Sequence, residues 1–206
     1  MSDYSRRRTV MVDTQVRPSD VTSFPIIDAM LTVPREIFVP DALKSAANAE
    51  AHLDEADGRI MLDCRTFAKM LEAIDVGPDD LVLDIACGLG YSSAVIAHMA
   101  EAVVALEDTA ARVGAAETSL SDAGIDNVAV VEGVLSDGAA KHGPYDAIVI
   151  NGSVETVPDA ILDQLKTDGR VVAIFTEGQL GTGKLGLKTT TGLNWRDSFN
   201  ANAPTL

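Results

Sequence analysis

From about Asp80 onward, short runs of branched apolar residues alternate with alanine-rich amphipathic stretches. This alternation is typical of βα units in a parallel sheet whose two faces are covered by helices. The apolar runs predict five strands, at 81–85, 103–107, 128–131, 147–150 and 171–175. Three helices are predicted between them, at about 91–100, 109–123 and 158–165. The chain is therefore expected to be an α/β protein with a mostly parallel sheet.

The segments on either side of this alternation have different patterns. The first 75 residues look helical, and prolines break them into short segments, at Pro18, Pro25, Pro34 and Pro40. The tail after Gly178 is punctuated by glycines and predicts an antiparallel hairpin that finishes the sheet. We therefore expect a helical cap at 1–75 and a core at 76–206, together forming one compact domain.

Net charge and composition indicate which binding partners and which cellular compartment to expect for this protein. The 206 residues include 16 Lys and Arg against 31 Asp and Glu, so the net charge of −15 repels phosphate backbones and anionic membranes. Arg6, Arg7 and Arg8 are not followed by the apolar stretch of an export signal, and no 18-residue apolar run occurs. The two cysteines and three histidines lack zinc-ligand or disulfide spacing. We expect a cytoplasmic, metal-free protein that binds neither nucleic acid nor membranes.

The candidate chemistry lies in the turn after the first predicted strand. Asp84 stands at the end of that strand, Gly88 and Gly90 lie in the turn, and a helix begins at about Tyr91. Ligands of open α/β sheets bind at the carboxyl ends of the strands, where glycines let the backbone approach them closely. Glu107 ends the next strand, where a carboxylate can accept hydrogen bonds from both hydroxyls of a ribose. These features predict a site for a nucleoside-containing cofactor.

The residues of the turn favour S-adenosylmethionine over a dinucleotide. A dinucleotide fingerprint requires a third glycine where this chain has Ser93. A carboxylate at Asp84 is unfavourable beside a pyrophosphate and favourable beside the ammonium of a methionine moiety. A nicotinamide-dependent oxidoreductase is accordingly the less favoured alternative. The alternative interpretation of the glycine pair is a tight turn that binds no ligand. Cys87 is interpreted as a packing residue in preference to a nucleophile.

Beyond this turn, several segments together resemble the protein-L-isoaspartate O-methyltransferase family. The matching segments are 11–17, 28–30, 33–40, 83–91, 144–148 and 165–170. The three segments of the N-terminal cap, 11–17, 28–30 and 33–40, are the most specific of them. Two positions depart from the family pattern within these segments, because Ala86 and Asp168 stand where the family has glycine.

The resemblance implies a Rossmann-like class I methyltransferase fold, with a seven-stranded, mostly parallel sheet and an antiparallel C-terminal strand. It also implies transfer of a methyl group from S-adenosylmethionine to the side-chain carboxylate of an isomerised aspartyl residue, a repair reaction. A carboxylate is already a nucleophile, so no catalytic residue has to be assigned. The expected cofactor-binding residues are Asp84, Ala86, Cys87, Gly88, Gly90, Tyr91, Glu107 and Gly133.

The departures from the family at the active site leave the methyl acceptor open. Ile60 and Leu62 stand where the family has Thr and Ser, and Asp54, Glu55 and Arg59 are gained nearby. The family's Gly-Asp-Gly after the third strand is Gly133-Val134-Leu135 here, with Glu132 or Asp137 as possible substitutes for the missing acid. The acceptor is expected to be a protein or peptide carboxylate, or a small molecule. The alternative is a methyltransferase-like protein that binds the cofactor but has an altered substrate or no catalysis.

Overall fold

The computed structural model describes residues 3–56, 58–177 and 180–206. The N-terminal part begins with helices α1 and α2, continues through 3-10 turns to the hairpin strands β1 and β2, and ends with helix α3. Their bounds are α1 Asp3–Met11, α2 Phe24–Thr32, β1 Leu53–Ala56, β2 Arg59–Met61 and α3 Cys64–Ile74. Asp63 caps α3, since its side chain accepts a hydrogen bond from the backbone N–H of Thr66.

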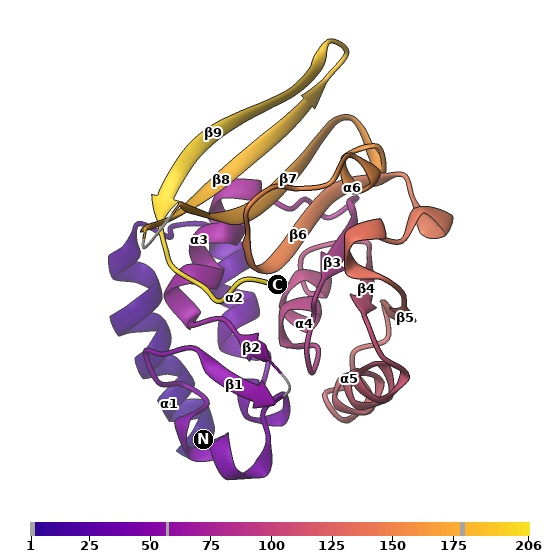
Figure 1. Cartoon of the computed structure of the whole chain (residues 1–206). Helices are drawn as coiled ribbons and strands as arrows, with labels where there is room; N and C mark the ends of the chain where they lie inside the picture. Colours follow the sequence, from indigo (N-terminus) through magenta and orange to yellow (C-terminus); the bar gives the residue numbers. More distant parts are fainter. Residues whose placement is uncertain (1–2, 57, 178–179) are drawn as a thin grey trace.

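The remainder forms a seven-stranded sheet with connecting helices (Figure 1). The strands are β3 Leu81–Ile85, β4 Ala102–Glu107, β5 Val128–Glu132, β6 Tyr145–Val154, β7 Leu165–Glu177, β8 Leu180–Thr189 and β9 Gly192–Asn200. The helices are α4 Tyr91–Ala97, α5 Ala110–Asp122 and α6 Asp159–Leu162. The strand order is β5-β4-β3-β6-β7-β8-β9, with parallel pairing up to β7 and antiparallel pairing of β8 and β9. The expected mostly parallel sheet with its C-terminal hairpin is confirmed.

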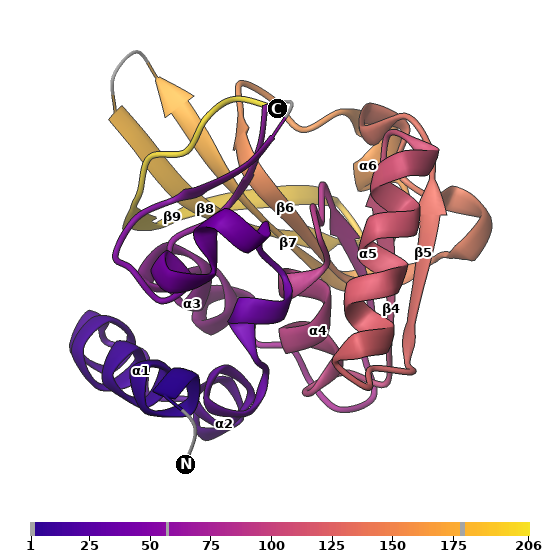
Figure 2. The same ribbon diagram turned by 90° about the horizontal axis from the view of Figure 1, so that it is seen from below.

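Alternate residues of the central strands pack on opposite faces of the sheet. On one face, Val82, Val103 and Val172 join a large core with α2, α3 and α4. On the other face, Leu83 and Val104 join a smaller core with Ile161 of α6. Figures 1 and 2 show how the N-terminal helices pack against the side of the sheet that α4 covers. The cap and the sheet therefore share one core.

The structure corrects several of the expected elements. The cap is not wholly helical, because residues 53–56 and 59–61 form two antiparallel strands in which Leu53 pairs with Met61. Both of these residues are buried, so the hairpin is held by its apolar inner face. Helix α4 ends at Ala97, three residues earlier than predicted, and α6 has only four residues because Leu165 already belongs to β7.

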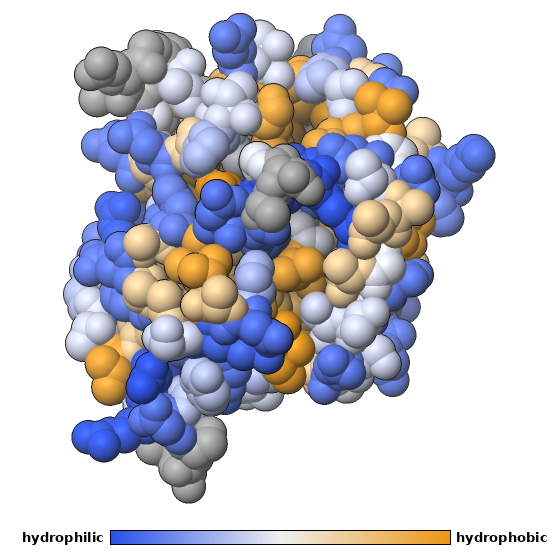
Figure 3. Space-filling view, turned by 60° about the horizontal axis from the view of Figure 1, so that its bottom comes forward, coloured by the Kyte–Doolittle hydropathy of each residue, from blue (hydrophilic) through white to orange (hydrophobic). Residues whose placement is uncertain are grey.

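The surface of the molecule is mixed in polarity. Figure 3 shows one face of the molecule, on which hydrophobic patches lie between hydrophilic residues. In the part of the chain that the structure describes, no helix has the length and apolar character needed to cross a membrane.

Candidate cofactor site

The turn between β3 and α4 has the conformation of a ligand-binding loop. Ala86, Gly88 and Gly90 all adopt left-handed backbone conformations, with φ of 60°, 58° and 95°. The left-handed conformation is easy for glycine but costs about 1 kcal/mol or more for alanine. The turn is closed by a hydrogen bond from the N–H of Gly90 to the carbonyl of Cys87, at 2.9 Å. The backbone shape expected of a glycine is thus kept at position 86 although the residue is alanine.

Asp84 is enclosed by a network of protein donors. Its Oδ2 accepts hydrogen bonds from the hydroxyls of Ser92 and Ser93, at 2.6 and 2.5 Å, and its Oδ1 accepts one from the amide of Asn151, at 2.6 Å. Burial raises the pKa of Asp84 to about 6, although these three donors act in the opposite direction. Asp84 therefore ties β3 to α4 and β6 and fixes the position of the turn.

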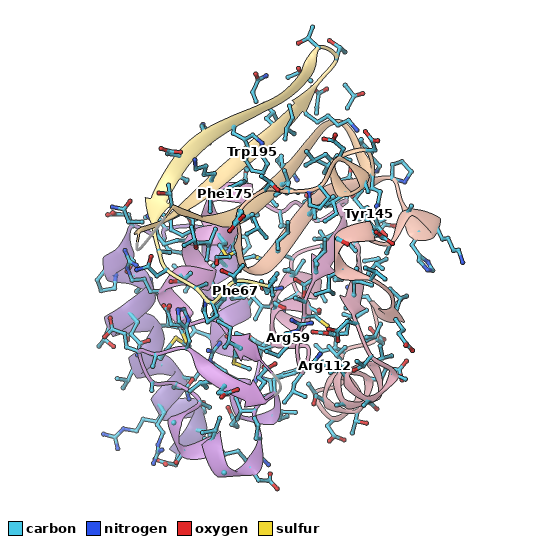
Figure 4. All side chains as sticks on the ribbon, viewed as in Figure 1. Arg59, Phe67, Arg112, Tyr145, Phe175 and Trp195 are labelled. Carbon is cyan, nitrogen blue, oxygen red and sulfur yellow. The ribbon has the colours of Figure 1, made fainter. Side chains whose placement is uncertain are left out.

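Glu107 is fully buried at the end of β4 and is held by groups from two other segments. Its Oε1 accepts a hydrogen bond from the N–H of Gly88 at 2.7 Å. Arg59 of β2 forms a bidentate ion pair with it, from Nε to Oε1 at 3.0 Å and from one terminal nitrogen to Oε2 at 3.1 Å. The same nitrogen of Arg59 donates to Asp108 at 2.9 Å, and Asp108 also pairs with Arg112 of α5. Figure 4 shows Arg59 and Arg112 reaching this region from opposite sides.

Glu55 of β1 contacts the glycine turn. Its Oε2 accepts a hydrogen bond from the N–H of Leu89 at 3.1 Å, and its carboxylate lies directly over the Cα of Gly88. The pairing of β1 and β2 shifts between Asp54 and Ala56, and a bulge of this kind redirects the side chain of the extra residue. Burial raises the pKa of Glu55 to about 8, and the nearby charge of Glu107 adds to this effect.

Two cavities lie beside these groups. The larger has a volume of about 930 Å³ and is lined in part by Asp108, Glu132, Gly133, Val134 and Leu135. The smaller, between the hairpin and the turn, has a volume of only about 10 Å³ and is lined in part by Glu55, Ile60, Leu62, Tyr91 and Asn151. The site therefore has an open end near β5 and a filled end beneath the hairpin.

Tyr91 and Cys87 have packing roles in this structure. The ring of Tyr91 is buried against Phe38 and Phe67, and the guanidinium of Arg35 lies 4.5 Å from its centroid. Arg35 is itself fully buried and donates to the carbonyls of Ala47 and Leu62, at 2.6 and 2.7 Å. Cys87 is buried, and desolvation raises the pKa of its thiol, which suits a packing residue better than a nucleophile.

The structure brings together most of the residues that the sequence singled out and adds others. Gly88 and Glu107 touch through a hydrogen bond, and Gly133 is tied to the backbone of Glu107 at 2.9 Å. Asn151 and Ser92 were not predicted from the sequence, and Arg35 was recognised only as part of segment 33–40, because the roles of all three depend on contacts between distant segments. It noted Glu55 and Arg59 as acquired charges, but their spacing of 52 and 48 residues from Glu107 gave no sign of a contact.

The donors and acceptors of this site match those that S-adenosylmethionine requires. The N–H of Leu89 in the turn already holds the carboxyl group of Glu55. The two oxygens of Glu107 already accept from Arg59 and from the backbone N–H groups of Gly88 and Asp108. The 930 Å³ cavity beside them offers room for a nucleoside. The fold and this site together define a class I methyltransferase.

Comparison with known proteins places the chain within a particular family. Residues 6–182 match the model of the protein-L-isoaspartate(D-aspartate) O-methyltransferase family. A protein-L-isoaspartate O-methyltransferase of Methylorubrum extorquens is 37% identical over 170 residues, which cover 82% of this chain and 74% of that protein. One of Herpetosiphon aurantiacus is 32% identical over 203 residues, covering 98% and 90%. The chain belongs to the protein-L-isoaspartate(D-aspartate) O-methyltransferase family.

Solved structures support the fold assignment. One protein-L-isoaspartate O-methyltransferase superposes with a TM-score of 0.82 at 24% identity and covers 98% of this chain, which spans 65% of that chain. A Plasmodium falciparum structure described as such an enzyme, in complex with S-adenosyl-L-homocysteine, also gives 0.82, at 17% identity, with 100% and 99% coverage. The expected class I fold, the methyltransferase family and S-adenosylmethionine as the cofactor of that family are confirmed.

Proposed function

We propose that this chain transfers the methyl group of S-adenosylmethionine to a carboxylate of a protein or peptide, with isoaspartyl residues as the first substrate to test. The observation that carries the proposal is the pairing of the glycine turn with Glu107 beside a nucleoside-sized cavity, in a chain of this family. The bound cofactor supplies an electrophilic methyl group on a sulfonium, and the acceptor carboxylate supplies the nucleophile. The protein then has to bind, align and desolvate the reactants.

We assign the cofactor contacts to residues of the turn and the neighbouring strand ends. The N–H group of Leu89 faces the position of an amino-acid carboxylate, and Glu107, which holds the N–H of Gly88, faces the position of the ribose hydroxyls. Gly133, Val134 and Leu135 border the cavity assigned to the nucleobase. Asp84 is assigned a positioning role through Ser92 and Asn151, because its oxygens already accept three donors. Ala86, Gly90, Tyr91 and Cys87 shape the turn from within.

The acceptor side of the site differs in polarity from the family pattern. Ile60 and Leu62 both line the small cavity, and Leu62 is also buried in the main core. Hydrocarbon at these positions keeps the site dry but offers no hydrogen bond to an acceptor carboxylate. This favours a second candidate function, cofactor binding with a different or less polar methyl acceptor.

Compartment and partner class follow from the composition. Cys64 and Cys87 are both free thiols buried within the described structure, which is usual in a reducing compartment. The net charge of −15 disfavours binding to nucleic acid. We therefore assign the chain to the cytoplasm, with a protein substrate in preference to a nucleic acid.

A methyl-transfer assay tests this proposal. The wild-type chain and the double variant Ile60→Thr with Leu62→Ser are incubated with radiolabelled S-adenosylmethionine and an isoaspartyl peptide. The matching aspartyl peptide serves as the control. The proposal expects selective labelling of the isoaspartyl peptide, weak in wild type and stronger in the double variant. Labelling of neither peptide by either protein, while S-adenosylhomocysteine binds, favours the second candidate function.

A further inference from the structure

The hairpin β1–β2 occupies the part of the site that the cofactor needs. Arg59 donates from Nε and one terminal nitrogen to Glu107, and from the same terminal nitrogen to Asp108, so both oxygens of Glu107 are engaged. Arg59 is 7% exposed and Glu107 is fully buried. A ribose cannot reach the Glu107 carboxylate while this bidentate pair is in place, because the guanidinium takes the same lone pairs.

Glu55 blocks a second, separate contact. Its carboxylate accepts from the N–H of Leu89, which is the position assigned above to the carboxylate of the cofactor's amino-acid group. A Cβ atom added at Gly88 would lie 1.9 Å from Oε2 of Glu55, so this side chain fills the space that the glycine leaves free. Only about 10 Å³ remains between hairpin and turn, which is room for about one water molecule and not for the amino-acid part of a cofactor.

The contacts made by Glu55 and Arg59 resemble those expected of two different parts of S-adenosylmethionine. Glu55 places a carboxyl oxygen on the Leu89 N–H of the turn, and Arg59 places a pair of donors on Glu107, as ribose hydroxyls do. The cavity at the nucleobase end stays open, with a volume of about 930 Å³. Both imitating side chains come from one short hairpin of four and three residues, and a bulge directs one of them inward.

We propose that the β1–β2 hairpin is a built-in competitor of the cofactor, and that S-adenosylmethionine enters only when Arg59 and Glu55 leave Glu107 and the glycine turn. This inference rests on the proposed function. A two-stranded hairpin is only marginally stable by itself, so its closed position depends on the contacts that it makes. Closed molecules cannot bind the cofactor, so the measured affinity falls as the closed fraction rises. A variant that loses a closing contact should therefore bind the cofactor more tightly.

Calorimetric titration with S-adenosylhomocysteine tests the competition. The variants are Arg59→Met, which frees Glu107, and Arg112→Met, a matched control that removes an equal charge from the other side of Asp108. We expect Arg59→Met to bind at least tenfold more tightly than wild type and Arg112→Met to stay within about twofold. Equal or weaker binding by Arg59→Met overturns the proposal, because Arg59 would then be neutral or part of the binding site.

A second variant covers the case in which Arg59→Met does not fold. Glu55→Ala removes the carboxylate from the turn while leaving the Arg59–Glu107 pair intact, and it too should bind S-adenosylhomocysteine more tightly. Failure of the competition and failure of the proposed function give different results. Unchanged tight binding in all folded proteins contradicts the competition alone, whereas no binding in wild type or either variant contradicts the proposed function as well.

Discussion

At the scale of single residues, two positions have the left-handed backbone conformation that glycine favours, although neither residue is a glycine. Ala86 and Asp168 have φ of 60° and 67°, and these are the two positions where the matched segments depart from the family's glycines. Ala86 is buried, so its methyl group offsets part of the conformational cost. Asp168 is exposed within β7 and has no such compensation beyond the tolerance of aspartate for this region.

The substitution Asp168→Gly should therefore stabilise the protein. Relief of the left-handed conformation is expected to raise the free energy of unfolding by about 0.5 kcal/mol, measured by denaturant titration. Thr167→Gly is the matched control in the same strand and should lower the free energy by about 0.5–1 kcal/mol, since its φ is not in the left-handed region. A loss of stability in Asp168→Gly would show that the aspartate side chain has a stabilising role.

The sequence predicts those residues of the site that act through their own strand or turn. Asp84, Gly88 and Glu107 were found because they lie at or just after the ends of predicted strands, and parallel strands bring their ends to one edge of a sheet. The occupation of Glu107 by Arg59 was not predictable. It depends on the path of the chain between the cap and the sheet, which no local pattern encodes.

At the scale of elements, the hairpin links cofactor affinity to pH. The closed hairpin binds a proton on Glu55, because burial raises its pKa from 4.5 to about 8. Glu107 adds to this rise, while Arg35 and Arg59 oppose it. In an open hairpin the group is in water and ionises near its ordinary pKa. The closed form is therefore favoured at low pH and weakens as the pH rises toward 8, above which the effect levels off.

The affinity for S-adenosylhomocysteine should accordingly rise between pH 6 and pH 8 in the wild type. The rise is limited to roughly tenfold per pH unit. Asp84, whose pKa is about 6, titrates in the same range, so Glu55→Gln is the control that keeps Asp84 and removes only the Glu55 proton. A difference between the two profiles assigns the effect to Glu55. Superimposable profiles would contradict it.

The elements themselves were predictable to different degrees. Strand β3 was predicted residue for residue, because a run of mostly branched apolar residues begins after Asp80 and ends at the turn that contains Gly88 and Gly90. Residues 53–56 and 59–61 were assigned to a helical cap and form strands instead. Their alternation is only a few residues long, and it becomes clear only when Leu53 and Met61 are seen to face the same core.

At the scale of the whole molecule, cap and sheet should unfold together. Buried residues of the cap, such as Met30 and Phe67, belong to the same core as Val82 and Val172 of the sheet. We therefore expect one cooperative thermal transition, coincident when followed by far-ultraviolet circular dichroism and by the fluorescence of Trp195 on β9. Two separate transitions would show that residues 1–75 form an independent unit.

The central claim is that the cofactor site lies at the ends of β3 and β4 and that the hairpin vacates it when the cofactor binds. Amide hydrogen exchange with and without saturating S-adenosylhomocysteine tests both parts at once. We predict slower exchange in residues 86–90 and faster exchange in the hairpin residues 53–56 and 58–61, because ligand binding normally protects contacts but here releases a competing segment. Slower exchange in the turn and the hairpin together would contradict the account.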